Sequence, residues 1–115
     1  MHFWVDELRS SDKVIIVEGK KDEVSLKKLG ITNIITINRP IFQLVEEISN
    51  KHNGVIILTD LDKQGKKLYS VLKHHLQKRG IKVDNKFREF LYRNTKLSNI
   101  EGINTYLKNI ENPFL

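Results

Sequence analysis

Two aspartates separated by one residue form the part of this sequence best suited to chemistry. Asp60 and Asp62 follow the apolar run 54–58, which is too short for a helix, and precede a segment at 66–79 with helical periodicity. Side chains two residues apart in an extended segment point to the same side, so both carboxylates can face one point while Leu61 turns into the core. Because adjacent like charges need a cation between them, and Mg²⁺ prefers carboxylate oxygens, we predict a divalent-metal site here.

A glutamate belongs to the same predicted site. Glu18 follows the β-branched run 14–17, and the carboxyl ends of parallel strands share one edge of a sheet. If the two strands are neighbours, Glu18 meets Asp60 and Asp62 at that edge. Glu18 could then be a further metal ligand or a general acid or base. A metal ion held there polarises a phosphate oxygen, so the pattern favours phosphodiester cleavage or transfer with Mg²⁺, or alternatively Mn²⁺.

Basic residues follow both acidic segments. We predict that four of them contact phosphate. One lies two positions after Glu18, and the other three lie at the start of the helix after Asp62: Lys20, Lys63, Lys66 and Lys67. Gly19 and Gly65 would let the backbone come close to a ligand. The simpler interpretations remain open: Lys20 as a solvated side chain, and the two aspartates as a helix N-cap and a surface acid.

Strands and helices alternate at short intervals along the chain. The sequence predicts strands at 14–17, 33–37, 55–59 and 81–83, and helices at 21–29, after Pro40, and at 66–79, 85–93 and 100–109. Strands without polar alternation are covered on both faces. We therefore predict an α/β fold with a four-stranded, mainly parallel sheet covered by helices on both faces. The single domain 1–115 would comprise a core at 13–84, an N-terminal segment at 1–12 and a C-terminal helical extension at 85–115.

The net charge of +6 is unevenly distributed. Residues 1–62 carry eight Lys/Arg and ten Asp/Glu, whereas residues 63–115 carry twelve and four. An acidic half that binds a metal and a basic half that binds a polyanion predict DNA or RNA as the partner. The absence of cysteines, of a signal sequence and of a long apolar run predicts a cytoplasmic protein without a membrane partner.

The two acidic segments together resemble the Toprim domain, a Rossmann-like fold. The resemblance rests on Val17-Glu18-Gly19-Lys20 with Asp22, and on Thr59-Asp60-Leu61-Asp62 with Gly65, and covers roughly residues 13–84. It implies Mg²⁺ bound by three catalytic carboxylates, Glu18, Asp60 and Asp62, with Glu18 as the acid or base. Primases, topoisomerases, OLD nucleases and a ribosomal-RNA maturase share this domain. The chain is most similar to the small stand-alone Toprim proteins of archaea and some bacteria.

The larger Toprim enzymes carry further domains that this chain lacks. Its three tyrosines occupy no recognisable setting for a topoisomerase nucleophile: Tyr69, Tyr92 and Tyr106. We therefore expect neither strand passage nor primer synthesis from this chain alone. Two functions stay open, a Mg²⁺-dependent nuclease or nucleotidyl-transferring enzyme and a non-catalytic protein that binds or protects nucleic acid or serves a processing assembly.

Several further residues have expected roles. Asp22 is interpreted as a first-turn helix acid, with a place in the site as the alternative. Glu101 matches only weakly a late acidic position of small family members. Hydrophobic side chains near both ends predict a homodimer interface, unless they fold back on the domain: Phe3, Trp4, Phe114 and Leu115.

Overall fold

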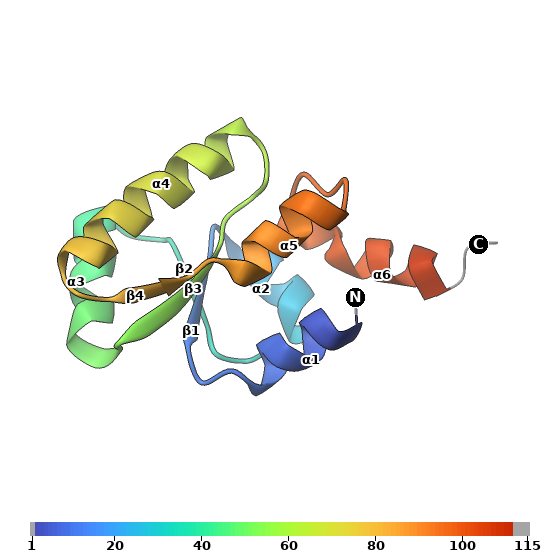
Figure 1. The fold of residues 1–115 in the computed structure, drawn as a ribbon, viewed down its shortest axis with the longest axis horizontal. Coiled ribbons are helices and arrows are strands. Elements are labelled where there is room, and N and C mark those ends of the chain that lie inside the picture. Colours follow the sequence, from blue (N-terminus) through green and yellow to red (C-terminus); the bar gives the residue numbers. More distant parts are fainter. Residues whose placement is uncertain (1, 112–115) are drawn as a thin grey trace.

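A four-stranded sheet lies between two layers of helices in the computed structural model, which describes residues 2–111 without the side chain of Glu111 (Figure 1). In chain order the elements are α1 (His2–Ser10), β1 (Val14–Val17), α2 (Lys20–Lys27), β2 (Ile34–Thr36), α3 (Ile41–Lys51), β3 (Gly54–Leu58), α4 (Lys63–Lys78), β4 (Lys82–Asp84), α5 (Lys86–Asn94), the 3₁₀ helix η1 (Ile100–Gly102) and α6 (Ile103–Glu111). Within this range no helix is both long enough and apolar enough to span a bilayer.

The strand order β2-β1-β3-β4 makes the first and third strands neighbours, and every pairing in the sheet is parallel. Val17, the last residue of β1, pairs with Leu58, the last residue of β3. Residues 18 and 59 are therefore the first residues beyond the same sheet edge. The predicted α/β fold is confirmed, and the adjacency of β1 and β3 on which the predicted site depends is present.

Each face of the sheet has its own hydrophobic core, because alternate strand residues point to opposite faces. Ile16 and Ile57 pack with buried residues of α3 and α4. Val17 and Leu58 pack on the other face with buried residues of α1, α2, α5 and α6. Burial on both faces explains why the strands are uninterrupted apolar runs. In Figure 1, α3 and α4 lie apart from the remaining helices, on the other side of the sheet.

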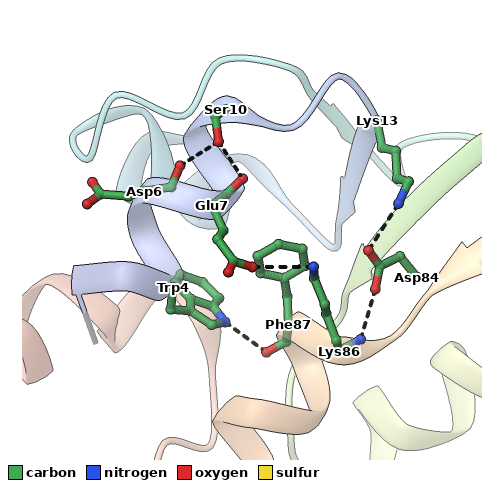
Figure 2. Close-up of polar contacts among 8 residues, drawn as sticks. All are labelled: Trp4, Asp6, Glu7, Ser10, Lys13, Asp84, Lys86 and Phe87. Carbon is green, nitrogen blue, oxygen red and sulfur yellow. Dashed lines mark hydrogen bonds and ion pairs between the residues drawn. The ribbon is translucent and has the colours of Figure 1, made fainter.

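Helix α1 packs against the start of α5 (Figure 2). The Trp4 indole donates a hydrogen bond from Nε1 to the Phe87 carbonyl at 2.9 Å, and the two rings pack edge to face. Figure 2 also shows the ion pair between Glu7 and Lys86, at 3.3 Å. Trp4 is only 2% exposed. Its expected place at a dimer interface is wrong, because it folds back on its own domain.

Phe3 differs from Trp4, since it stays 57% exposed although its ring meets Phe90 edge to face. Phe114 and Leu115, the other residues of the predicted interface, lie outside the described residues. The homodimer therefore stays a prediction.

The segment after β4 packs on the same core as α2. Phe87 and Leu91 of α5, Ile100 of η1, and Ile103 of α6 are buried there beside Leu26. Residues 98–100 thereby run close to the carboxyl end of β3, as the hydrogen bonds described below show.

Candidate functional site

Glu18 and Asp60 meet at the carboxyl edge of the sheet. Oε2 of Glu18 accepts a hydrogen bond from the backbone N–H of Asp60 at 2.7 Å, across the boundary between β1 and β3. The two residues are 42 positions apart in the chain. The parallel pairing of their strands brings them together, as the sequence predicts.

The C-terminal segment also holds Asp60 in place. Oδ1 of Asp60 accepts a hydrogen bond from the backbone N–H of Ile100 at 3.0 Å. The next residue, Leu61, donates its N–H to the Ser98 carbonyl at 2.9 Å and turns its side chain into the core, 8% exposed. The predicted inward orientation of Leu61 is confirmed, and the orientation of the Asp60 carboxylate depends on residues outside the motif.

Arg88 of α5 lies buried beneath the same loop, with 8% exposure. Its guanidinium donates to the Thr59 carbonyl at 3.2 Å and to the Asp60 carbonyl at 2.7 Å, and it lies 4.7 Å from the centre of the Tyr69 ring. Burial lowers the pKa of Arg88, while nearby Tyr69 and carboxylates, among them Glu18 and Asp60, oppose the shift. Arg88 thus fixes two successive carbonyls of the loop that carries Asp60.

Arg88 is not among the site residues predicted from the sequence. It lies three residues before Leu91, so the two share one face of α5, and Leu91 is fully buried. An arginine on the inner face of an amphipathic helix indicates a buried partner, and that signal was present in the sequence.

Gly65 is required by a backbone contact. A Cβ atom at Gly65 would lie 1.9 Å from the Asp60 carbonyl oxygen, far inside van der Waals contact. The buried Thr59 hydroxyl donates to the Gly65 carbonyl at 2.8 Å and closes the same turn. A glycine is therefore needed at position 65, but the expected reason is wrong. The space next to Gly65 is filled by the backbone of Asp60 and is not open to a ligand.

Asp62 caps helix α4. Its Oδ1 accepts the Gly65 N–H at 2.7 Å, so the helix begins at Lys63, three residues before the predicted start. This is the N-cap arrangement that the sequence left open for the aspartate pair. Capping occupies one carboxylate oxygen, and the side chain is exposed, so the second oxygen is available to a ligand.

Asp22 is buried beside the site, with 7% exposure. Its Oδ2 accepts the Gly19 N–H at 3.0 Å, as a first-turn acid of α2 that caps its own helix. Burial raises the pKa of Asp22, the Gly19 hydrogen bond opposes this, and the charges of Asp60 and Glu101 raise it further. Asp22 is therefore the expected first-turn acid of α2 and also lies among the site carboxylates.

Negative charge accumulates around Glu18. Burial raises the pKa of Glu18, the hydrogen bond from the Asp60 N–H opposes the shift, and the charges of Asp60, Asp22 and Asp62 add to it in that order. A cation would relieve this repulsion and favour the ionised carboxylates.

Among the side chains that the structure describes, which exclude that of Glu111, no three or more His, Asp or Glu residues are already arranged to hold a metal ion. Glu18, Asp60 and Asp62 each use one oxygen on a backbone N–H and keep the other. Mg²⁺ is commonly held by only one or two carboxylates, with water and substrate phosphate completing its octahedron. The oxygen donors at this edge fit Mg²⁺ on those terms.

The four lysines predicted to contact phosphate lie near the N-terminal ends of α2 and α4, the helices that begin beside the site. Lys20 is exposed and lies 3.5 Å from Glu23. Lys66 lies over the Tyr92 ring, 4.6 Å from its centre. Lys63 and Lys67 are exposed. All four side chains are accessible to a polyanion approaching this edge.

The order of the elements and the two acidic segments agree with a family model described as the Toprim domain, which matches residues 12–85. The chain belongs to the Toprim domain family. Its relatives include a UPF0292 protein of Methanocaldococcus jannaschii, 39% identical over 90% of this chain and 86% of the relative. A UPF0292 protein of Pyrococcus abyssi is 41% identical over 90% and 82% of the respective chains. These small archaeal relatives confirm the predicted similarity to stand-alone Toprim proteins.

Two solved structures share the fold of this Toprim protein. One, a protein of Aquifex aeolicus, superposes with a TM-score of 0.83 at 34% identity and covers 88% of this chain and 95% of the other. The second contains the zinc-binding and RNA polymerase domains of the Aquifex aeolicus primase, with a TM-score of 0.57 at 22% identity over 92% of this chain and 27% of the primase chain. The primase likeness concerns the fold alone.

Proposed function

We propose that this Toprim protein acts on DNA or RNA and cleaves phosphodiester bonds with a divalent ion, Mg²⁺ or Mn²⁺, bound by Glu18, Asp60 and Asp62. The observation that carries the proposal is the 2.7 Å contact between Glu18 and the Asp60 backbone, which sets carboxylates from two strands at one sheet edge. Toprim domains generally bind Mg²⁺, and the excess of basic residues after position 62 suits a polyanionic substrate.

Each residue of the site has a distinct role in this proposal. A divalent ion, when bound, would neutralise the charge that develops on the phosphate oxygens. Glu18 has a raised pKa and keeps Oε1 outside its hydrogen bond with Asp60. Oε1 is therefore the atom that would bind the ion or, when it is not coordinated, would hold or transfer a proton. Asp60 and Asp62 supply oxygen ligands, and Arg88 positions the Asp60 backbone.

The lysines at the starts of α2 and α4 would bind the phosphates on either side of the reacting bond: Lys20, Lys63, Lys66 and Lys67. Lys66 packs on the Tyr92 ring, and Tyr92 is 53% exposed, so an aromatic face lies beside this basic helix end. A base could stack on the exposed part of that ring.

A second candidate is nucleic-acid binding without turnover, either to protect the strand or as part of a processing assembly. One observation favours it: among the described side chains no three metal-binding groups are already arranged to hold an ion. In that case the basic residues would bind the backbone, and the carboxylates would only position the loop after β3.

Cleavage assays separate the two candidates. Labelled single- and double-stranded DNA and RNA are incubated with Mg²⁺ or Mn²⁺, using the wild type, Glu18→Gln, Asp60→Asn and the control Glu46→Gln, which removes an exposed charge on α3. We expect metal-dependent cleavage by the wild type and the control, and a loss of at least about 100-fold in both site variants. Equal cleavage by all four proteins would refute the assigned site, and binding without cleavage would support the second candidate.

A homodimer remains part of the proposal. Two exposed aromatic side chains, Phe3 at 57% and Phe42 at 71%, are available for contact with a second copy. Sedimentation equilibrium of the wild type should give twice the 13.5 kDa chain mass, and a single-chain mass at all concentrations would contradict the dimer.

A further inference from the structure

We propose that a single nucleic-acid strand leaving the carboxylate edge lies in the groove between α2 and α6, held there through its phosphates. This α2–α6 groove has a volume of about 520 Å³, with four lysines on its rim and polar residues on its floor: Lys20, Lys21, Lys28, Lys108, Ser25 and Asn104. The inference rests on the proposed action on nucleic acid and names the surface that carries the strand.

The α2–α6 groove is lined by residues that neighbour the site. Asp60 accepts a hydrogen bond from the Ile100 N–H, and the next residue, Glu101, lines the groove. On the other side, Lys20 follows Glu18 by two residues and begins the helix that forms one wall. A strand that passes the carboxylates can therefore continue along η1 into the space between the two helices.

The charges of the groove suit phosphate. Lys21, Lys28 and Lys108 form no ion pair with any described side chain, and Lys20 is 82% exposed beside Glu23. Glu101 is the acidic residue of the lining, and it lies at the end next to the site carboxylates. Four cations and one anion leave a net positive channel, which attracts a polyanion.

The walls of the groove are fixed before any ligand binds. Asn104 of α6 donates from Nδ2 to the backbone carbonyl and the hydroxyl of Ser25, at 2.9 and 2.8 Å. Ser25 is 5% exposed and donates its hydroxyl to the Glu101 carbonyl at 3.1 Å. These hydrogen bonds tie α6 and η1 to α2, so binding does not need to order the two helices.

The lining favours a backbone-binding surface over a site for one small molecule. The Ser25 hydroxyl and the Asn104 amide nitrogen on the groove floor are already used in hydrogen bonds between the helices, which leaves the lysine side chains as the charged groups that can meet a ligand. The lysines are spread along both helices on flexible stems. Such a surface binds successive phosphates with little sequence preference.

Salt-dependent binding tests the groove. We would measure fluorescence anisotropy of labelled 12-nucleotide oligo(dT) and oligo(U) in EDTA, at KCl concentrations from about 50 to 300 mM. The test variant is Lys21→Gln/Lys28→Gln/Lys108→Gln. The matched control, Lys51→Gln/Lys78→Gln/Lys82→Gln, removes three exposed lysines near the opposite edge of the sheet, also without ion pairs to described side chains.

Each phosphate contact on a single strand contributes about 0.7 to the slope of log K against log salt. The groove variant should lose about 2 in slope and roughly 100-fold in affinity near 0.1 M salt, whereas the control should lose less than about threefold. Equal losses in both variants would show a general charge effect and overturn the inference. Unchanged binding by the groove variant would also overturn it, while leaving the proposed cleavage intact because Lys21, Lys28 and Lys108 lie outside the carboxylate site. If wild-type protein bound neither oligonucleotide, both proposals would fail.

Discussion

Replacing Arg88 with alanine tests whether α5 holds the site loop in place. The buried Thr59 carbonyl would lose its guanidinium donor, which costs about 1–3 kcal/mol, and the half-buried Asp60 carbonyl would exchange its donor for water at about 1 kcal/mol. Loss of the contact with the Tyr69 ring adds about 1 kcal/mol. Part of this sum is offset because the buried guanidinium no longer has to be desolvated. We expect a net loss of about 2–4 kcal/mol, or roughly 8–16 °C in Tm.

Arg93→Ala on the same helix is the matched control. Arg93 is exposed, and its one ion pair among the described residues is with Glu89 one turn away, so its loss should cost no more than about 0.5 kcal/mol. Urea denaturation followed by circular dichroism measures both variants. If Arg88→Ala is no less stable than Arg93→Ala, the loop does not depend on the buried guanidinium.

Arg88→Lys separates positioning from stability. Lysine keeps the charge but lacks the planar fork that reaches two carbonyls at once. At a temperature where the variant is fully folded, we expect cleavage to fall about tenfold or more, because small displacements of site groups are costly. Wild-type rates in folded Arg88→Lys would contradict a positioning role.

Three further predictions concern stability. Gly65→Ala should lower the free energy of unfolding by at least about 3 kcal/mol, because the new Cβ would lie 1.9 Å from the Asp60 carbonyl oxygen. The control Gly19→Ala, which has open space around its Cβ, should lower it by no more than about 1 kcal/mol in the same denaturation assay. Equal losses would contradict the close contact at Gly65. The pKa of Glu18 is higher in the folded protein than in the unfolded chain, so the protonated form favours folding. This contribution to stability is fully present at a pH below the pKa of the unfolded chain, and it is lost as the pH rises through the pKa of the folded protein. Without metal, Glu18→Gln should therefore gain Tm over the wild type between pH 4 and pH 7, and a constant difference across that range would refute the sign. Trp4→Phe removes the donor to the Phe87 carbonyl and should cost about 1–2 kcal/mol by thermal melting, and a neutral effect would show that α1 is held by its apolar contacts alone.

The fold was largely predictable because the strands are short apolar runs and each helix has one apolar face. Val17 and Leu58 end two of these runs. Val17 is followed by Glu18, and Leu58 is followed by Thr59 and Asp60, and these polar residues end the apolar pattern. Adjacency of the two strands did not follow from periodicity, since several strand orders satisfy the same pattern. The adjacency was therefore an assumption of the predicted site, and the pairing of β1 with β3 shows that it is correct.

The candidate site was predictable only where it lies in the motif. Contacts from Arg88 and Ile100 come from 28 and 40 residues beyond Asp60. The place of Arg88 on the inner face of α5 signals a buried partner, but no local pattern says which part of the chain that partner is. The role of Gly65 was misjudged because a glycine needed for backbone packing and a glycine needed for ligand approach look identical in a sequence.

Calorimetric titration with Mg²⁺, repeated with Mn²⁺, tests the central claim most directly, because it needs neither a substrate nor turnover. At pH 8 the wild type and the Glu46→Gln control should bind the ion with the same affinity, whereas Glu18→Gln, Asp60→Asn and Asp62→Asn should each bind at least about tenfold more weakly. A wild type that binds neither ion, or five proteins that bind them equally, would contradict a metal site at the shared edge of β1 and β3.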